Sequence, residues 1–242
     1  MSSHVLHLGD CLRGLMELPD RSVDHVLSDP PYEAEAHTKQ RRTKETGAEF
    51  AKVVECPLNF APISGAERVQ IAREMGRIAR RWVIVFCQAE AVQAWREALQ
   101  DGGLVYKRAC VWIKPDAMPQ LTGDRPGMGY ESIVVAHTPG RSVWNGGGRV
   151  GVYEFNKNRS DLERTGHPTQ KPLALMEALV RDFTDAGDLV CDPYSGSGTT
   201  GVACRRLGRS FVGWEVSPDY HAMALQRLAA TNEQFGLWSG AA

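Results

Sequence analysis

The sequence predicts an α/β protein whose mostly parallel sheet is covered by helices on both faces. Short apolar runs alternate along the chain with amphipathic stretches of helical length, and this alternation is typical of strands joined by crossover helices. The apolar runs do not switch cleanly between apolar and polar residues, which indicates strands buried on both faces. We see no segment that repeats along the chain, so a repeat architecture is not expected.

Individual elements follow from these patterns. The expected strands lie at residues 5–8, 23–27, 82–86, 105–113, 132–136, 188–191 and 210–214. The expected helices lie at residues 66–80, 89–100, 173–184, 199–207 and 218–231, and residues 12–18 can begin another. The boundary of the last helix is clear, because Ser217 can cap its first turn and Pro218 suits the first helical position.

The length fits one large α/β domain or two small ones, and we expect a single globular domain over residues 1–242. The chain is 43% hydrophobic and 24% charged, as expected for an ordinary core. Its net charge of −1 neither indicates nor excludes a nucleic-acid partner. The six cysteines form no C-x-x-C pair and the seven histidines are dispersed, so neither a metal site nor a disulfide framework is expected. No apolar stretch is long enough to span a membrane and no leader is visible, which predicts a cytoplasmic location.

Two long segments interrupt the alternation of strands and helices. They are a loop insertion at about residues 33–62 and a second segment at about residues 139–165. Loops of this length in a compact domain are usually functional or disordered. The first contains a basic run at residues 39–44, which could contact phosphates or could simply be solvated.

A glycine-rich loop stands between an expected strand and an expected helix near the C-terminus. Gly196, Gly198 and Gly201 fit the G-x-G-x-x-G pattern of dinucleotide-binding proteins, and Glu215 stands about where a ribose-binding acid belongs. Taken alone, this pattern predicts a nicotinamide-dependent dehydrogenase. The absence of a lysine after Gly201 excludes a P-loop.

Asp192, which precedes this loop, changes the interpretation. Its charge would repel a pyrophosphate but suits a cationic group such as the ammonium of an amino acid. Few residues follow Glu215, so a second nucleotide-binding half is not expected downstream. The glycines allow the backbone to approach a ligand closely, and Glu215 can accept both ribose hydroxyls. These features together suit a nucleoside that bears an amino acid, which is S-adenosylmethionine.

The stretch Asp29-Pro30-Pro31-Tyr32 follows the expected strand at residues 23–27. Proline neither donates to a sheet nor continues a helix, so this stretch is a stiff loop that fixes a carboxylate and an aromatic ring. An aspartate before a loop usually closes a turn. The glycine loop elsewhere in the chain favours a catalytic interpretation instead.

With these motifs in this order, the chain resembles the amino-methylating DNA methyltransferases, in the permuted group whose catalytic loop precedes the cofactor loop. Residues 29–32 match the family's D-P-P-Y, and residues 192–200 are similar to D-P-F-x-G-S-G-T-T, with Tyr194 in place of Phe. Residues 167–172 are similar to H-x-T-Q-K-P, residues 9–11 to the G-D element, and residues 111–115 with Tyr130 and Glu131 to W-x-K…Y-E.

The resemblance implies a fold and a set of site residues. The fold is the Rossmann-like fold of S-adenosylmethionine-dependent methyltransferases: a seven-stranded, mostly parallel sheet with one antiparallel strand, whose first strand here is residues 188–191. The implied catalytic residues are Asp29, Pro30, Pro31 and Tyr32. The implied cofactor-binding residues are Asp10, Cys11, Asp29, His167, Thr169, Lys171, Asp192, Pro193, Tyr194, Ser195, Gly196, Ser197, Gly198, Thr199, Thr200 and Glu215. The expected DNA contacts are Lys39, Arg41, Arg42, Lys44, Arg149, Lys157 and Arg159, the last three in or near a short target-recognition segment.

The D-P-P-Y loop suits methylation of an exocyclic amine. Asp29 can accept one amino hydrogen and the carbonyl of Pro30 the other, which localises the nitrogen lone pair. Tyr32 offers a ring on which a base flipped out of double-stranded DNA can stack. A covalent attack on a cytosine ring carbon usually needs a Pro-Cys pair, and the chain has only the reverse, Cys56-Pro57.

The predicted function is transfer of a methyl group from S-adenosylmethionine to the N6 amine of adenine in DNA. Methylation of the N4 amine of cytosine is the alternative, and Asp29 favours adenine by resemblance, since the cytosine enzymes more often have Ser there. RNA or protein-glutamine methyltransferases usually have Asn at this position. An inactive DNA-binding module and a dehydrogenase are the remaining alternatives. Relatives in bacteria and phages often form dimers, so a homodimer is one expectation.

Overall fold

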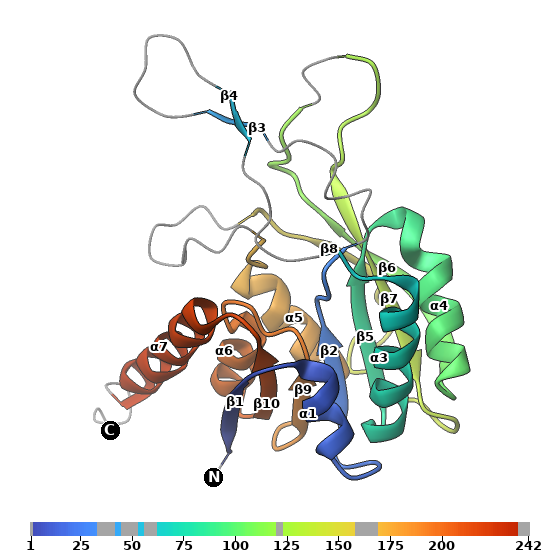
Figure 1. Ribbon diagram of the computed structural model, residues 1–242, viewed down its shortest axis with the longest axis vertical. Helices are drawn as coiled ribbons and strands as arrows, with labels where there is room; N and C mark the ends of the chain where they lie inside the picture. Colours follow the sequence, from blue (N-terminus) through green and yellow to red (C-terminus); the bar gives the residue numbers. More distant parts are fainter. Residues whose placement is uncertain are drawn as a thin grey trace.

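The computed structural model describes residues 2–32, 42–44, 53–55, 62–119, 123–157 and 169–236, with 42–44, 53–55 and 232–236 described by their backbone alone. One mixed sheet runs through the molecule (Figure 1). Its strands, in spatial order, are β1 (His4–Leu8), β10 (Ser210–Glu215), β9 (Leu189–Asp192), β2 (His25–Ser28), β5 (Trp82–Cys87), β7 (Tyr130–His137), β6 (Val105–Ile113) and β8 (Val152–Glu154).

The strand directions confirm the mixed α/β fold. β7 runs antiparallel to both of its neighbours, β5 and β6, while all other neighbouring pairs are parallel. The expected number of seven strands is corrected to eight, because β8 adds to the edge of β6. β8 has three residues, of which only Tyr153 is buried, so it is too short to produce a periodic signal in the sequence. A separate pair, β3 (Arg42–Lys44) and β4 (Val53–Glu55), lies in the expected loop insertion.

Helices cover both faces of the sheet, as expected. One face carries α1 (Cys11–Glu17), α3 (Gly65–Ile78) and α4 (Val92–Asp101), preceded by a single 3₁₀ turn, η1 (Ala89–Ala91). The other face carries α5 (Leu173–Phe183), α6 (Thr199–Arg206) and α7 (Pro218–Gly236) (Figure 1). Two hydrophobic cores result, one on each face. β5 contributes to both and is buried along its whole length.

The boundaries of the helices have local causes. Ser64 caps α3 through a reciprocal pair of hydrogen bonds with Glu67, which satisfies two backbone N–H groups of the first turn.

Gly14 in α1 lies against the indole of Trp214, where a Cβ atom would fall 1.9 Å from the ring nitrogen. This glycine therefore sets how closely α1 packs on β10. No described helix is long and apolar enough to cross a membrane.

The order of the strands places the two sequence motifs together. β9 and β2 are neighbours in the sheet, and the helix after β9, α6, packs on one face whereas the helix after β2, α3, packs on the other. Open α/β sheets bind ligands beyond the carboxyl ends of their strands at such a switch point. Asp192 ends β9 and Asp29 follows β2, so both stand at this edge.

Candidate active site

Asp29 leaves the carboxyl end of β2 on the stiff Pro-Pro loop. Pro30 is buried, and the carboxylate side chain of Asp29 is only 22% exposed. One carboxylate oxygen, Oδ2, accepts a hydrogen bond from the ammonium of Lys171 at 2.5 Å. The other oxygen, Oδ1, is buried and has no hydrogen-bond partner among the described residues. A buried acceptor without a partner is unfavourable, so it marks a position prepared for a donor.

Lys171 stands directly before α5, where Pro172 is the N-cap residue. Its side chain is 8% exposed. The ammonium nitrogen lies 3.3 Å from Oε2 of Glu131 as well as beside Asp29, so one cation serves two carboxylates. It also lies 5.0 Å from the centre of the Phe86 ring and 5.5 Å from that of Tyr32. These distances allow cation–π attraction, which helps to hold a charge away from water.

Glu131, near the start of β7, joins the remaining groups. Its Oε2 accepts a hydrogen bond of 2.7 Å from the phenol of Tyr32, and its Oε1 is bound by the ammonium of Lys114. Lys114 follows β6, and its ammonium lies 4.7 Å from the centre of the Trp112 ring. The cluster therefore contains two carboxylates and two ammonium groups, drawn from four separate segments of the chain.

The two carboxylates of this cluster differ in proton affinity. Burial would raise the pKa of Glu131, but the ammonium groups of Lys171 and Lys114 outweigh burial and lower that pKa to about 2. Burial raises the pKa of Asp29, the Lys171 ammonium offsets only part of this, and the negative charge of Glu131 adds to it. Glu131 is thus a permanent anion, while Asp29 is the carboxylate that more readily takes a proton.

Asp192 shapes the glycine loop at the end of β9. Its side chain is buried, with Oδ1 accepting the backbone N–H of Tyr194 at 3.1 Å and Oδ2 accepting the hydroxyl of Thr200 at 2.5 Å. Burial raises the pKa of Asp192 to about 7, and the nearby carboxylates of Asp29 and Glu215 contribute to this increase. The carboxylate is thus already engaged by its own loop, and its expected contact with a ligand ammonium stays a prediction.

Helix α7 supports the loop from behind. Gly198 has a φ of +76°, and a Cβ atom there would lie 2.8 Å from the Cβ of Ala224, so only glycine fits this position without strain. The guanidinium of Arg227 donates to the carbonyl of Ser197 at 2.6 Å and to the hydroxyl of Thr199 at 3.0 Å. Arg227 was not expected from the sequence, because nothing near it in the chain indicates that it faces the loop.

The outer part of the expected cofactor site is formed where β10 and β1 end side by side. The backbone N–H of Gly9 donates to the carbonyl of Glu215 at 2.9 Å. Asp10 caps α1 by accepting the backbone N–H of Arg13, and Glu215 accepts the backbone N–H of Ser217 at 2.7 Å. Burial raises the pKa of the Cys11 thiol to about 12, so this cysteine stays protonated and is a poor nucleophile.

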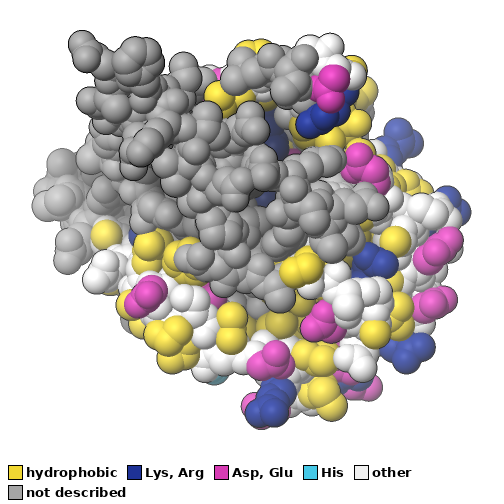
Figure 2. Space-filling model, turned by 45° about the horizontal axis from the view of Figure 1, so that its top comes forward, with side chains coloured by type: hydrophobic (Ala, Val, Ile, Leu, Met, Phe, Trp, Pro, Cys, Tyr) yellow, Lys and Arg dark blue, Asp and Glu magenta, His cyan; other side chains and the backbone are white. Residues whose placement is uncertain are grey.

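The expected DNA contacts fall in different places. Lys157 lies at the site edge, where its backbone N–H donates to Asp116. Arg149 is not brought to the site: its guanidinium pairs with Asp182, near the far end of α5. Arg42 and Lys44 belong to β3, and only their backbone is described. Lys39, Arg41, Arg159 and His167 lie outside the described residues. Around the described rim of this end of the molecule, acidic and basic side chains are interspersed (Figure 2).

Two residues of the charged cluster were missing from the expected site. Lys114 and Glu131 both stand at the ends of the antiparallel pair β6 and β7, where Trp112 and Glu131 are register partners. The W-x-K…Y-E resemblance points to these positions; from the sequence, Lys114 could contact a phosphate or be a surface lysine, and Glu131 has no expected role. Thr169, which was expected in the site, is half-buried just before Lys171. No cluster of metal-ligating side chains occurs in the described part of the chain.

Comparison with known proteins shows what the chain is similar to. Residues 148–226 match the family model of DNA methylases that modify N6 or N4 amines, a region that includes Lys171, Asp192 and Glu215 but not Asp29. The type II methyltransferase M.XycI of Xanthomonas campestris pv. cyanopsidis is 34% identical over 152 residues, which span 57% of this chain and half of that protein. The putative methylase YubD of Escherichia coli (strain K12) is 28% identical over 249 residues, 97% of this chain and 93% of that protein. The chain is thus similar to the N6/N4 DNA methylases.

Solved structures with a similar fold include methyltransferases. The complex of M1.HpyAVI with S-adenosylmethionine has a TM-score of 0.71 and 25% identity, and covers 93% of this chain and 98% of its own. The cytosine-N4-specific PvuII DNA methyltransferase has a TM-score of 0.72 at 16% identity, covering 98% of this chain and 92% of its own. The likeness to the PvuII enzyme concerns the fold alone. The fold of these two structures is thus shared along nearly the whole chain.

Proposed function

We propose that this protein transfers a methyl group from S-adenosylmethionine to the exocyclic N6 amine of adenine in double-stranded DNA. The observation that carries the proposal is the free oxygen of Asp29. Oδ1 is a buried acceptor without a described partner, on a stiff loop, beside the strand that leads into the glycine loop. An amino group of a base is a donor that would satisfy it.

The residues around the glycine loop fit S-adenosylmethionine. Gly198 lets the loop pack closely on Ala224 of α7, and the neighbouring strand ends present the carboxylates of Glu215 and Asp10. The residues that would hold it are those of the loop from Asp192 to Thr200, with Glu215 and Asp10 at the nucleoside end. When bound, it supplies the methyl group. Arg227 and Ala224 keep the loop in place by contacts with its backbone and side chains.

The chain's own contribution is to orient and polarise the amine. Asp29 accepts one amino hydrogen through Oδ1, and the carbonyl of Pro30 accepts the second, so the lone pair of the nitrogen is localised. Both acceptors are fixed by the Pro-Pro loop before the base arrives, which reduces the entropy lost on reaching the reactive geometry. Tyr32 presents its ring while its hydroxyl is held by Glu131, which keeps the ring in one orientation for a flipped base.

Methylation of cytosine N4 is the alternative, because its amine has the same donors and the fold is shared with a cytosine-N4-specific enzyme. The preference for adenine depends on the resemblance of residues 29–32 to D-P-P-Y. Both functions use the same acceptors, so the product distinguishes them.

The experiment is methyl transfer to unmethylated plasmid DNA, followed by digestion to nucleosides and mass spectrometry. We expect N6-methyldeoxyadenosine with the wild-type protein and none with Asp29→Ala. Asp101→Ala is the matched control, because Asp101 is an exposed residue at the end of α4, and it should behave as wild type. Detection of N4-methyldeoxycytidine instead would show that the methylated base is cytosine. Absence of both products from a protein that binds S-adenosylmethionine would refute it.

A further inference from the structure

Lys171 has a contact that its expected role did not include. The sequence placed it among the residues that line the cofactor pocket. In the structure its ammonium is bound to Asp29 at 2.5 Å and to Glu131 at 3.3 Å. Only 8% of the side chain is exposed, and its backbone is fixed at the start of α5. A lysine held in this way interacts with the amine acceptor itself.

We propose that Lys171 is a positioning residue for Asp29: its ammonium binds Oδ2, which favours the ionised carboxylate and keeps Oδ1 turned to the amine of the target base. This inference deepens the proposed function and rests on it. The geometry gives each oxygen of Asp29 a separate task. Oδ2 is bound by Lys171 and Oδ1 has no partner among the described residues. Without a cation at Oδ2, the buried carboxylate would lose the contact that fixes its rotation and the strongest of the interactions that favour its charge.

Glu131 completes the arrangement by holding Lys171 from its other side. It is bound in turn by Lys114 and by the hydroxyl of Tyr32. The ammonium of Lys171 thus contacts two carboxylates, and its distance from Asp29 determines how strongly it binds that residue. Glu131 also acts on Asp29 directly through the repulsion of like charges, because both carboxylates are within reach of the same ammonium.

Charged and titratable groups face Asp29 from every element that packs around it. Lys171 approaches from the start of α5, Glu131 from β7 and Lys114 from the end of β6. Asp192 approaches from the end of β9, and Tyr32 belongs to the loop of Asp29 itself. Two of these groups are cations and two are carboxylates, so removing a cation and removing a carboxylate should move the pKa of Asp29 in opposite directions.

The test measures the pKa of the Asp29 carboxyl in the full-length protein without DNA, by NMR with ¹³C-labelled aspartate. The resonance is assigned by its loss in Asp29→Asn. In Lys171→Met, which keeps the length of the side chain but removes its charge, we expect the pKa of Asp29 to rise by about one unit or more. In Glu131→Gln we expect it to fall, because the carboxylate that repels Asp29 is removed. Lys114→Met is the matched control, since this ammonium binds Glu131 but not Asp29, and it should cause a smaller rise than Lys171→Met.

Opposite shifts in Lys171→Met and Glu131→Gln support the proposal. An unchanged pKa of Asp29 in Lys171→Met overturns it. If that variant does not fold, Glu131→Gln decides in its place, because a pKa of Asp29 that fails to fall contradicts the arrangement. The affinity for S-adenosylmethionine, measured by calorimetry, separates the two roles of Lys171: a tenfold weaker affinity with an unchanged pKa would return it to the cofactor pocket.

Activity gives a second, independent readout. In single-turnover methyl transfer to plasmid DNA, the acidic limb of the pH profile should move to higher pH in Lys171→Met and to lower pH in Glu131→Gln. If the wild-type protein methylates neither adenine nor cytosine, the proposed function fails, while the NMR titration still decides the role of Lys171. If the wild-type protein is active and the limb stays in place in both variants, the positioning role fails alone.

Discussion

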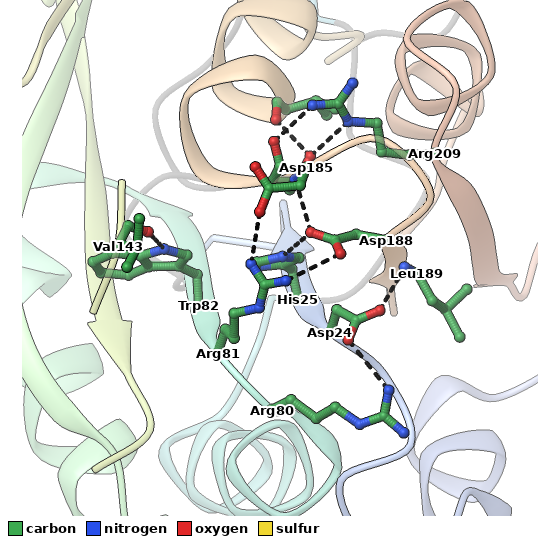
Figure 3. A network of polar contacts seen from close by, with 12 residues as sticks. Asp24, His25, Arg80, Arg81, Trp82, Val143, Asp185, Asp188, Leu189 and Arg209 are labelled. Atoms are coloured by element: carbon green, nitrogen blue, oxygen red, sulfur yellow. Dashed lines mark hydrogen bonds and ion pairs between the residues drawn. The ribbon is translucent and has the colours of Figure 1, made fainter. Parts of the chain in front are cut away.

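The sheet carries an ion-pair network at each end of its strands: one at the amino-terminal edge, where the parallel strands begin, and one at the carboxyl-terminal edge, where they end. The two networks have similar compositions but differ in how fully their carboxylates are hydrogen-bonded. At the amino-terminal edge, Arg81 binds Asp185 and Asp188 at 3.1 Å each, and His25 binds Asp188 at 2.8 Å (Figure 3). Asp24 accepts hydrogen bonds from Arg80 and from the backbone N–H of Leu189. At the carboxyl-terminal edge, the cations are lysines and one oxygen of Asp29 has no described partner.

The difference lies in how fully the carboxylates are bonded. At the amino-terminal edge, both oxygens of Asp24, Asp185 and Asp188 accept hydrogen bonds, so nothing is left for a ligand. The planar guanidinium of Arg81 bridges two of these carboxylates, which suits a fixed joint. The incomplete bonding of Asp29 leaves one acceptor for a substrate. The unpartnered Oδ1 thus distinguishes Asp29 from the three aspartates at the amino-terminal edge.

The largest effect should follow from removing the negative charge of the amine acceptor, Asp29. Asp29→Asn keeps the size of the side chain but removes its charge, and we expect single-turnover methyl transfer to fall by roughly 10³-fold. The free energy of unfolding should also fall, because the buried ammonium of Lys171 loses one of its two carboxylate partners. Rapid-quench kinetics and urea unfolding measure the two quantities. A variant that keeps a tenth of the wild-type rate would contradict the role of Oδ1.

The second largest difference between the two edges should be in how the free energy of unfolding depends on pH. The folded pKa of Asp192, about 7, is above its unfolded value, so the folded state holds an extra proton between about pH 4 and pH 7. The free energy of unfolding should therefore fall as the pH rises through this window, by about 2–4 kcal/mol. The same titration in Asp192→Asn should lack this decrease.

The pKa of Asp188 is shifted in the opposite direction, so its contribution to stability has the opposite dependence on pH. Burial would raise its pKa, but the bonds from His25 and the backbone outweigh burial and lower it. Its contribution is thus present above the unfolded value near pH 4 and is lost as the pH falls through the folded pKa. Equal pH slopes in the wild-type protein and in Asp192→Asn would show that the proton affinity of the glycine loop has been misjudged.

Removing a saturated carboxylate should affect stability rather than chemistry. Asp188→Asn loses the charge that binds Arg81 and His25, and we expect the free energy of unfolding to fall by about 2–3 kcal/mol. The single-turnover rate should stay within about twofold of wild type, because the amino-terminal edge lies at the other end of the strands. Asp101→Asn serves as the matched surface control in the same urea titration. A loss of rate without a loss of stability would reverse the assignment.

The smallest effect should come from exchanging the type of cation. Arg81→Lys keeps the charge but cannot bridge Asp185 and Asp188 with two parallel donors. Because Arg81 is partly exposed, we expect a loss of only about 0.5–1 kcal/mol of unfolding free energy. Thermal unfolding at neutral pH measures it. An unchanged melting temperature would mean that the fork geometry of the arginine does not contribute.

Much of the fold could be predicted from local patterns. The expected strand at residues 105–113 has the same ends as β6, and the other expected strands and helices differ from the structure mainly by one or two residues at their ends. β8 could not be predicted, since a three-residue strand carries too little periodicity, and the same holds for β3 and β4. One antiparallel strand followed from the family resemblance, but its identity as β7 did not, because no local pattern distinguishes β7 from its neighbours.

The site was predictable in its motifs but not in its connections. The D-P-P-Y and glycine loops are contiguous in sequence, so their residue types alone indicate stiff turns at strand ends. The ion pair between Asp29 and Lys171 joins residues 142 positions apart, and it exists only because β2, β9 and the start of α5 meet at one edge. Asp192 shows the same limit: its type suggested a ligand contact, while its partners, Tyr194 and Thr200, are fixed by how the loop folds back.

The central place of β9, between β10 and β2, also has a consequence for the synthesis of the protein. A ribosome releases residues 25–32 long before it has made residues 189–200. Until then β2 lacks its neighbour, and Asp29 lacks both the glycine loop and, for most of that time, Lys171. Domains fold as units once their sequence is complete. A nascent or truncated chain would therefore have no assembled site, so the fold itself would delay any modification of the genome until the whole domain has formed.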